Sequence, residues 1–533
     1  IPQLTSNHLD RASLRITLEC LTILWTKTST TERRRETRRQ GIELCDGLLL
    51  LWETFPEDET IVSPISLILK SWTKLFPTDS SVRESLIRQS NLVSFFRRQL
   101  ERETSSTQKS TGLLNIMKHV VFRADAQQKE FLYEQWKDVV IRAIQVPPTS
   151  HTRDVQPCAE YVSAILWNWA TCPQVARTMA SSSEMWICLD ILLQNALENR
   201  DVTVQRNAVS AVGTIISFFG ESSKHQDRGE AADSAADDQE NEPREPPDVL
   251  QNQKWIIRSL IEVIHTTSDS DSKRRCLRTV RCLSSSPWGR AYLSRNNPKD
   301  EKPLLPLLLQ VLRRPERDVN IHVQICQTVV SLAPSFTEDW VQAWISHMEV
   351  ALMQKVQDPT TEKGLVLAAL SAISVCIGAS ASDQSLGWDA TEFYRQLAQL
   401  LEKYKNDGTF YHRTADLMNR IVRHDCETYR EATHGSSESM VDEHNGEDAE
   451  EEGSCCLASN SHILEILCLL LSPASSNSCS AAELEHSHQA TADTLKYLVN
   501  HPDSRNKKAL ADHEELLTAL VNLCLVIPVG STK

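Results

Sequence analysis

Glycine is scarce in this sequence, at 15 of 533 residues, whereas an average protein contains about 7% glycine. Rossmann folds, phosphate-binding loops and β-barrels need glycine at tight turns, so the composition argues against all three. The sequence also has no G-x-S-x-G elbow, no G-x-x-x-x-G-K loop and no complete H-E-x-x-H motif. It therefore offers no catalytic residue, and we expect a protein that is not an enzyme.

Paired cysteines and glycosylation sites are missing as well. None of the 15 cysteines forms a C-x-x-C pair, and the chain contains no N-x-S/T sequon. The cysteines stand singly on apolar stretches, which is typical of buried thiols in a reducing compartment, so we expect a cytoplasmic or nuclear protein. The residues nearest to a metal set fit no tetrahedral spacing; they are Cys455, Cys456, His462, His486 and His488. The sequence therefore predicts neither a metal nor a cofactor.

The net charge of −15 is concentrated in two segments. Residues 221–248 hold 10 acidic and 3 basic side chains, and residues 436–452 hold 8 acidic and no basic ones. Both segments have almost no large apolar residues, so they cannot bury enough surface to offset the entropy of ordering. We expect two disordered acidic loops, over 221–248 and 435–460, whose field can steer a basic partner or shield the chain's own arginines.

The rest of the chain shows the period of an amphipathic helix. Val204, Ala208, Val212 and Ile215 share one face, and similar stretches follow one another with short polar breaks. Helices are predicted over 9–25, 32–52, 112–123, 127–144, 158–171, 255–265, 340–356, 391–404 and 414–423. Tryptophans on their apolar faces are interpreted as core residues, with an aromatic groove as the less favoured alternative: Trp167, Trp169, Trp186 and Trp340. The uncharged run 365–377 is too short for a bilayer core of about 30 Å and is interpreted as a buried helix.

Internal repetition is the most informative feature of the sequence. Asp201 and Asp318 lie 117 residues apart and each precedes an apolar helical stretch, and Leu192 and Leu309 keep the same offset. A third copy, beginning at Asp358, follows Asp318 after 40 residues, close to the period of about 40–47 of HEAT and armadillo repeats. We expect each aspartate to cap the helix that follows it.

The segment Ala164 to Ala170, followed by Pro173 and Arg177, resembles the third helix and the following turn of an armadillo repeat. Residues 185–193 and 201–215 resemble the next second and third helices, and weaker copies lie at 304–332 and 502–525. The resemblance implies an all-α, armadillo/HEAT-like right-handed superhelical solenoid. With about 42 residues per repeat, the chain outside the acidic loops holds eleven to twelve repeats.

The resemblance also implies a function and candidate residues for it. Third helices of this family form a concave surface that binds a protein or an extended peptide, and an asparagine there holds the peptide backbone. Asn168 matches that position, and Asn419 is a second candidate. We therefore expect a protein–protein interaction scaffold with a partner that the sequence does not identify. A tryptophan that import receptors of the family carry is replaced by Ala164, which argues against an import receptor.

Two arginine-rich stretches leave an alternative open. They are candidate basic contacts: Arg34, Arg35, Arg38 and Arg39 in the first stretch, and Arg274, Arg278 and Arg281 in the second. They would serve a nucleic-acid- or phosphoinositide-associated factor if both lined one groove. Nucleic acid is less favoured, because the predicted helices are electrically neutral as a set and no nucleic-acid-binding motif accompanies the arginines.

The repeats and loops together predict five regions along the chain. N-terminal helical repeats span 1–220, the first acidic loop spans 221–248, and central armadillo-like repeats span 249–434. The second acidic loop spans 435–460, and C-terminal repeats span 461–533. Because no polar helix closes the array after the last apolar helix, the sequence predicts that the C-terminal repeats are truncated.

Overall fold

A computed structural model describes most of the chain outside the two acidic segments. The described residues are 11–27, 30–56, 58–73, 83–102, 107–145, 155–220, 254–294, 304–314, 316, 318–336, 346–358, 361–377, 390–404, 407–435, 460–471, 481–501 and 504–526. Across these ranges the regular structure is helical and no strand occurs. The predicted all-α class is confirmed. The predicted disorder of 221–248 and of 436–459 lies outside the described residues.

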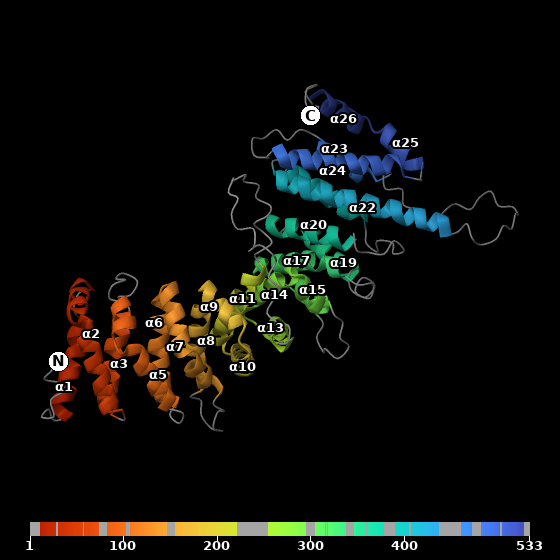
Figure 1. Cartoon of the computed structure of the whole chain (residues 1–533). Coiled ribbons are helices and arrows are strands. Elements are labelled where there is room, and N and C mark those ends of the chain that lie inside the picture. Colours follow the sequence, from red (N-terminus) through yellow and green to blue (C-terminus); the bar gives the residue numbers. More distant parts are fainter. Residues whose placement is uncertain are drawn as a thin grey trace, which may run out of the picture. The chain divides into compact units, whose positions relative to one another are not determined.

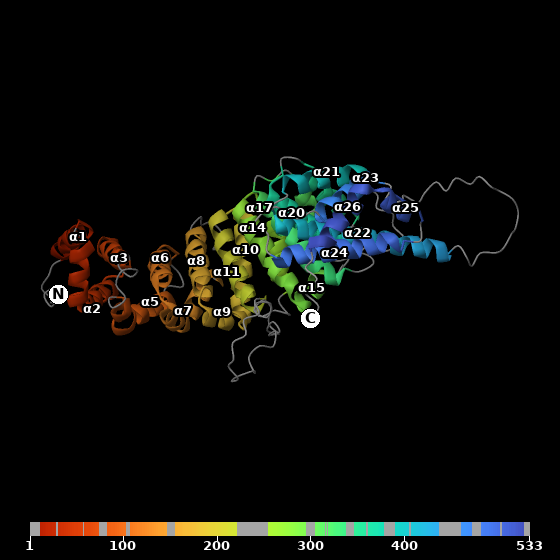
Figure 2. The ribbon, with the colours of Figure 1, turned by 90° about the horizontal axis from the view of Figure 1, so that it is seen from above.

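The chain divides into two compact units, Ile1–Leu283 and Ser284–Lys533. In unit 1 the longer helices form two rows. The third-helix row contains α1 (Arg11–Lys27), α3 (Glu59–Thr73), α6 (Thr107–Arg123), α8 (Val155–Ala170), α11 (Val202–Gly220) and α14 (Ser270–Ser285). The second-helix row contains α2 (Thr30–Thr54), α5 (Leu92–Arg102), α7 (Ala126–Gln145), α10 (Ser183–Asn199) and α13 (Lys254–Thr266). Successive helices pack together from α1 to α11 in the third-helix row and from α2 to α13 in the second-helix row, and α3, α6, α8 and α11 also pack against the second-helix row. Figures 1 and 2 show these pairs side by side.

Short helices complete some of the repeats. In unit 1 they are the π-helical turn η2 (Ser85–Gln89) and α9 (Pro173–Ala180), which packs between α8, α10 and α11. Pro173 stands at the first position of α9, where a missing backbone N–H costs nothing. This is the turn that the armadillo resemblance placed after the helix of Ala164 to Ala170, so that part of the resemblance is confirmed.

Unit 2 repeats the two-row arrangement. Its third-helix row contains α17 (Val319–Leu332), α20 (Lys363–Ile377), α22 (Gly408–Gly435) and α24 (Ala481–Val499), which stack in that order (Figure 1). Its second-helix row contains α16 (Leu304–Arg313), α19 (Ser346–Gln357), α21 (Ala390–Lys403), α23 (Ser461–Leu471) and α26 (Glu514–Val526). The shorter elements are α15 (Pro287–Ser294), the 3-10 turn η5 (Ala333–Ser335) and α25 (Ser504–Asp512).

Asp201 and Asp318 cap helices as predicted, whereas Asp358 lies five residues before the start of α20. Asp201 Oδ1 accepts hydrogen bonds from the backbone N–H of Thr203 (3.0 Å) and Val204 (3.1 Å) at the start of α11. Asp318 accepts from the N–H of Asn320 (3.0 Å) at the start of α17. Free N–H groups at a helix start need such acceptors. These two aspartates therefore fix where α11 and α17 begin.

The core lies between the two rows and is largely as the helical pattern predicts. Trp169 and Trp186 are fully buried, and Trp186 Nε1 donates to the carbonyl of Ala180 at 2.9 Å. Trp167 differs from the prediction, because it is half-buried on the outer side of α8. The helical spacing placed it beside the core, but α8 is covered on one side only. Trp340 lies outside the described residues.

The uncharged run after Gly364 forms the buried helix α20, as predicted. Leu365, Ala369, Leu370 and Ile373 are nearly inaccessible to solvent, and α20 packs against α17, α19 and α22. Among the described helices, none combines the length and the apolar character needed to cross a membrane.

Candidate interaction surface

The predicted site residues are distributed over both units. Asn168 lies half-buried on α8, and Asn419 lies half-buried on α22 of unit 2. Arg274 and Arg278 are exposed on α14, and Arg281 is half-buried there. The first arginine stretch falls within α2, but the side chains of Arg34, Arg35, Arg38 and Arg39 lie outside the described residues. Only Asn168 and the second arginine stretch therefore belong to one described surface.

That surface is the outer side of the third-helix row of unit 1, here called the third-helix face. Its residues are solvent-accessible and come from four successive helices: Asn115, Lys118 and Phe122 of α6; Tyr161, Ala164, Trp167 and Asn168 of α8; Asn207, Gly213 and Thr214 of α11; and Arg274, Arg275, Arg278 and Arg281 of α14. On their other side, α6, α8 and α11 pack against helices of the second-helix row. The face therefore combines amides, aromatic rings and cationic groups on a rigid backbone.

Arg275 joins three of these helices. From α14 its Nη1 donates to Ser210 Oγ of α11 at 2.5 Å. Its guanidinium carbon lies 5.4 Å from the ring centroid of Trp167 on α8. Its Nε also donates to Asp271 Oδ2 at 2.9 Å, one turn earlier on α14. A guanidinium stacked over tryptophan is worth about 0.5–2 kcal/mol. This contact holds Trp167 and the guanidinium in fixed positions on the face.

Arg275 can cross α11 because small residues lie beneath it. At Gly213, an added Cβ would be 2.5 Å from Thr279 Oγ1 of α14. This separation is shorter than real Cβ contacts, so a larger residue at position 213 would require the side chain of Thr279 to shift. Ser210 and Gly213 are thus small residues of α11 that lie between the larger side chains of α8 and α14.

Asn168 is oriented by its own helix. Its side-chain Nδ2 donates to the backbone carbonyl of Ala164 at 2.7 Å, and its backbone carbonyl accepts from Thr171 Oγ1 at 2.6 Å. On the next helix, Asn207 Nδ2 donates to the buried Ser163 Oγ at 3.3 Å. Two amide side chains of adjacent third helices are thus held against α8. Asn168 was predicted from the sequence, whereas Asn207 was not.

The α6–α8 junction repeats the cation–aromatic arrangement. Lys118 Nζ lies 4.6 Å from the ring centroid of Tyr161 and 3.7 Å from Glu160 Oε1. Partial burial, followed by the nearby Glu160, raises the pKa of Tyr161, so its hydroxyl stays protonated at neutral pH. The Lys118–Tyr161 and Arg275–Trp167 pairs involve residues far apart in sequence, so no local motif pointed to them.

An ion-pair network fixes α14 to α11 at the edge of the face. Arg206 Nε and Nη2 donate to the two carboxylate oxygens of Asp269 at 2.9 and 2.5 Å. Asp269 also accepts from the backbone N–H of Ser272 at 2.8 Å and so caps α14. The Arg206 hydrogen bonds hold the pKa of Asp269 well below its usual range. The pair therefore stays ionised, and it sets the register of the α14 arginines against α11.

A second polar cluster lies in unit 2, where α22 and α24 pack together. His412 Nε2 lies 3.5 Å from Asp416 Oδ2, and His486 Nε2 lies 3.3 Å from Asp416 Oδ1. These are the residues, among those described, that bring three metal-ligand atoms together, all within 4.8 Å of one another. In the sequence, His486 was weighed as a metal ligand together with Cys455, Cys456, His462 and His488. In the structure it lies instead beside His412 and Asp416 of α22, some 70 positions earlier.

The buried cysteine thiols are unreactive. Burial raises the pKa of Cys45, Cys188 and Cys326 to about 12, so these thiols are protonated at neutral pH. Cys45, Cys188 and Cys326 are core residues, as the sequence predicts, whereas Cys20 is exposed. A protonated, buried thiol is neither a nucleophile nor a metal ligand, so these three cysteines serve packing.

Comparison with known proteins gives a likeness of fold. The sequence matches no protein-family model, and no curated protein is similar to it. The crystal structure of SYS-1 superimposes with a TM-score of 0.51 and 11% identity, over 97% of this chain and 90% of that chain. A structure from work on a phosphorylation switch between cadherin and beta-catenin gives 0.48 and 11%, covering both chains completely. An engineered protein gives 0.47 and 14%, over 90% of this chain and 98% of its own. With its two rows of stacked helices, the chain has an armadillo-type helical-repeat fold.

Proposed function

We propose that the chain is a non-enzymatic protein-interaction scaffold and that its third-helix face binds an extended, acidic protein segment. The observation that carries the proposal is Arg275, which lies across α11 and stacks on Trp167. It links the amides of α8 and α11 to the arginines of α14 in one surface. The proposal specifies the chemistry of the partner, an extended acidic segment, and not its identity.

The spacing of the helices favours an extended ligand. Neighbouring packed helices lie about 8–10 Å apart, and an extended chain advances about 3.3 Å per residue. Each helix of the face therefore meets about every third residue of such a ligand. From α6 to α14 the face would hold roughly nine residues of the ligand. Amides such as Asn168 and Asn207 would form hydrogen bonds with the ligand's backbone, which has no neighbouring strand to pair with.

The charge of the face favours an acidic ligand. Arg274, Arg275 and Arg278 stand within five positions of one another, and α14 presents them outward. Arginine binds carboxylates with paired, charge-assisted hydrogen bonds that exceed neutral ones in strength. Arg275 is partly satisfied by Asp271. Arg278 forms no ion pair within the described part of the chain, and its guanidinium is therefore placed to meet a ligand carboxylate.

The test measures binding of three probes to the full chain by fluorescence anisotropy. The probes are a nine-residue peptide of alternating Glu and Ala, a single-stranded oligonucleotide of similar charge, and vesicles containing phosphoinositide. We expect the peptide to bind best, and the R274Q/R278Q variant to bind it at least about tenfold more weakly, because two charge-assisted contacts are lost.

The matched control is R97Q/R142Q, which removes the half-buried Arg97 of α5, paired with Glu101, and the exposed Arg142 of α7 in the second-helix row. It has the same net charge as the test variant and should bind the peptide as the unmodified chain does. Equal losses in both variants would reduce the effect to net charge and contradict the proposal. Preferential binding of the oligonucleotide or of the vesicles would replace it with the nucleic-acid or phosphoinositide alternative.

A further inference from the structure

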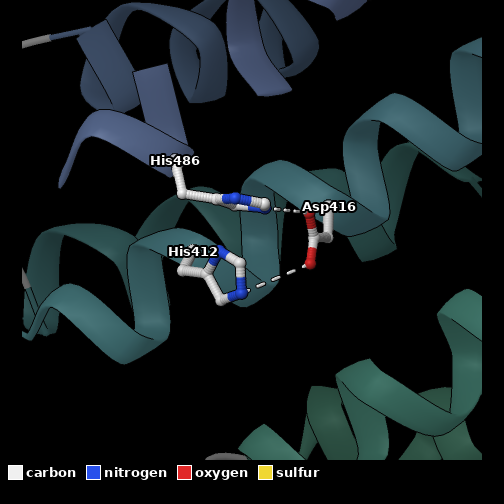
Figure 3. Close-up of side chains that lie close together, drawn as sticks. All are labelled: His412, Asp416 and His486. Atoms are coloured by element: carbon white, nitrogen blue, oxygen red, sulfur yellow. Dashed lines mark hydrogen bonds and ion pairs between the residues drawn. The ribbon is translucent and has the colours of Figure 1, made fainter. Parts of the chain in front are cut away.

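The His412, Asp416 and His486 cluster has the composition of a metal site. His412 and Asp416 are four residues apart on α22, so they lie one turn apart on the same side of that helix. His486 reaches them from α24 (Figure 3). The carboxylate lies beside the two neighbouring imidazoles, and each of its oxygens faces a nitrogen of one ring (Figure 3). Two imidazoles and one carboxylate form a common ligand set of zinc in proteins.

The separations between the ligand atoms are compatible with a shared metal ion. The two nitrogen–oxygen distances are 3.5 and 3.3 Å, whereas good N–H···O bonds measure about 2.7–3.2 Å. In a tetrahedral site with metal–ligand bonds of about 2.0–2.2 Å, neighbouring ligand atoms lie about 3.3–3.5 Å apart. The ring centroids of His412 and His486 lie 4.2 Å apart at 71°. The two distances reach different oxygens of Asp416; with one ligand atom from each residue, the three atoms lie within 4.8 Å of one another, and side-chain rotation can bring them closer.

The helices hold the ligands at this separation. The residues beside them turn into the core: Thr414 and Ala415 of α22 and Ser487 of α24 are fully buried. The ligand side chains themselves remain accessible, with 25% of His412, 34% of Asp416 and 57% of His486 exposed. Rigid positioning by packed helices, together with solvent access, leaves room for a fourth ligand such as water.

We propose that His412, Asp416 and His486 bind a divalent d-block cation, best matched by Zn²⁺, which links α22 to α24. Nitrogen and carboxylate ligands suit zinc and its neighbours better than calcium or magnesium, which prefer oxygen alone. The bound ion stabilises the folded chain, because the two helices supply the ligands together only when they are packed. The site is independent of the third-helix face in unit 1.

The test is isothermal titration of Zn²⁺ into the full, metal-free chain after alkylation of its accessible thiols, since exposed cysteines such as Cys20 would also bind zinc. We expect one site per chain. H486Q changes an exposed side chain and D416N is isosteric, so both should fold normally. Each should weaken zinc binding by about 100-fold or more, since loss of even an outer partner of a ligand costs about 10–100-fold.

The matched control is H462Q, which removes a histidine of α23 that pairs with Glu465 at 3.1 Å without a third ligand. It should bind zinc as the unmodified chain does. Thermal unfolding gives a second readout: at about 100 times its Kd, Zn²⁺ should raise the Tm by about 5 °C in H462Q but not in H486Q. Absence of binding, or equal binding by H486Q and H462Q, would overturn the proposal.

Discussion

The second-helix rows of the two units have the same architecture but different cores. In unit 1, edge-to-face aromatic pairs connect successive helices: Trp52 of α2 contacts Phe95 of α5 with ring centroids 5.5 Å apart, and Phe96 of α5 contacts Trp136 of α7 at 5.9 Å. In unit 2 the row is more aliphatic: α16 and α23 bury only leucine, isoleucine and valine, although α21 buries Phe393 and Tyr394. The same packing of helices is therefore reached with aromatic or with aliphatic contacts.

This difference shows that the pattern of apolar positions, more than the identity of the side chains, specifies the fold. A helix pair needs a covered apolar stripe, and many residues can fill it if their volumes match. The 11% identity to SYS-1 across nearly the whole chain is understandable on this basis. The two rows should nonetheless differ in how strongly one side chain matters, because aromatic contacts are larger and more directional.

The largest expected effect is that of W136A. Trp136 is fully buried, and its Nε1 donates to the carbonyl of Val93 at 2.9 Å, so the substitution leaves a cavity and removes this hydrogen bond. We expect a loss of about 3–5 kcal/mol in the free energy of unfolding, toward the upper end for core truncations. Because repeats contact only their neighbours, hydrogen exchange should rise in α5 and α7 and stay unchanged in α20.

The matched substitution in unit 2 is L467A, in the aliphatic row. It removes less volume and no hydrogen bond, so we expect a loss of about 2–3 kcal/mol, confined to α23 and its neighbours. A second control, W136F, keeps a ring but loses the hydrogen bond and should cost about 1–2 kcal/mol. An L467A effect larger than that of W136A would remove the proposed difference between the rows.

A smaller effect is expected from Asp269, which both caps α14 and pairs with Arg206. D269A loses both functions and should cost about 2 kcal/mol. D269N can still cap and should cost about 0.5–1 kcal/mol. Thermal unfolding of the two variants at pH 7 separates these contributions, and equal losses would mean that the ion pair, not the cap, stabilises the α11–α14 junction.

The pH dependence of the same residue has a definite sign. The folded-state pKa of Asp269 lies below its unfolded value of about 3.9. Its contribution to stability is therefore present above that pH and is lost as the pH falls below it. Between pH 5 and pH 3 the unmodified chain should lose more stability than D269N. Parallel pH profiles for the two proteins would contradict the assignment.

Unit 2 should lose stability at a higher pH than the Asp269 region of unit 1, and the loss should be smaller. Burial, followed by the nearby Lys355, lowers the pKa of His322 in α17 below its usual 6.5. The folded form thus binds fewer protons than the unfolded form, so stability is full above pH 6.5 and falls as the pH drops below it. Hydrogen exchange of α16 and α17 should increase between pH 7 and pH 5.5, after correction for the intrinsic exchange rate, and less so in H322Q.

Much of the fold follows from local sequence signals. The helical period placed α7 within one residue of its bounds, and Asp201 and Asp318 mark the starts of α11 and α17 because a capping side chain acts within three residues. The turn at Pro173 is equally local. Two-row packing then follows, because each helix has one apolar stripe to cover.

The surface was less predictable, because it depends on the register between helices. Asn168 and the α14 arginines were identified by motif and by composition. Trp167 was assigned to the core, since periodicity alone does not show which edge of an apolar stripe remains uncovered. Its contact with Arg275 and the contact of His486 with Asp416 join residues 108 and 70 positions apart. Such pairs are set by the relative rotation of stacked helices, which the sequence does not state.

The most direct test of the central claim asks where an acidic peptide lies on unit 1. The photoreactive residue p-benzoylphenylalanine would replace Ala164 on the third-helix face in one protein and Ile187, 41% exposed on α10 of the second-helix row, in another. After irradiation with the nine-residue peptide, we expect cross-linking from position 164, reduced by unlabelled peptide and by R274Q/R278Q. Cross-linking from position 187 instead, or equally from both, would contradict the account.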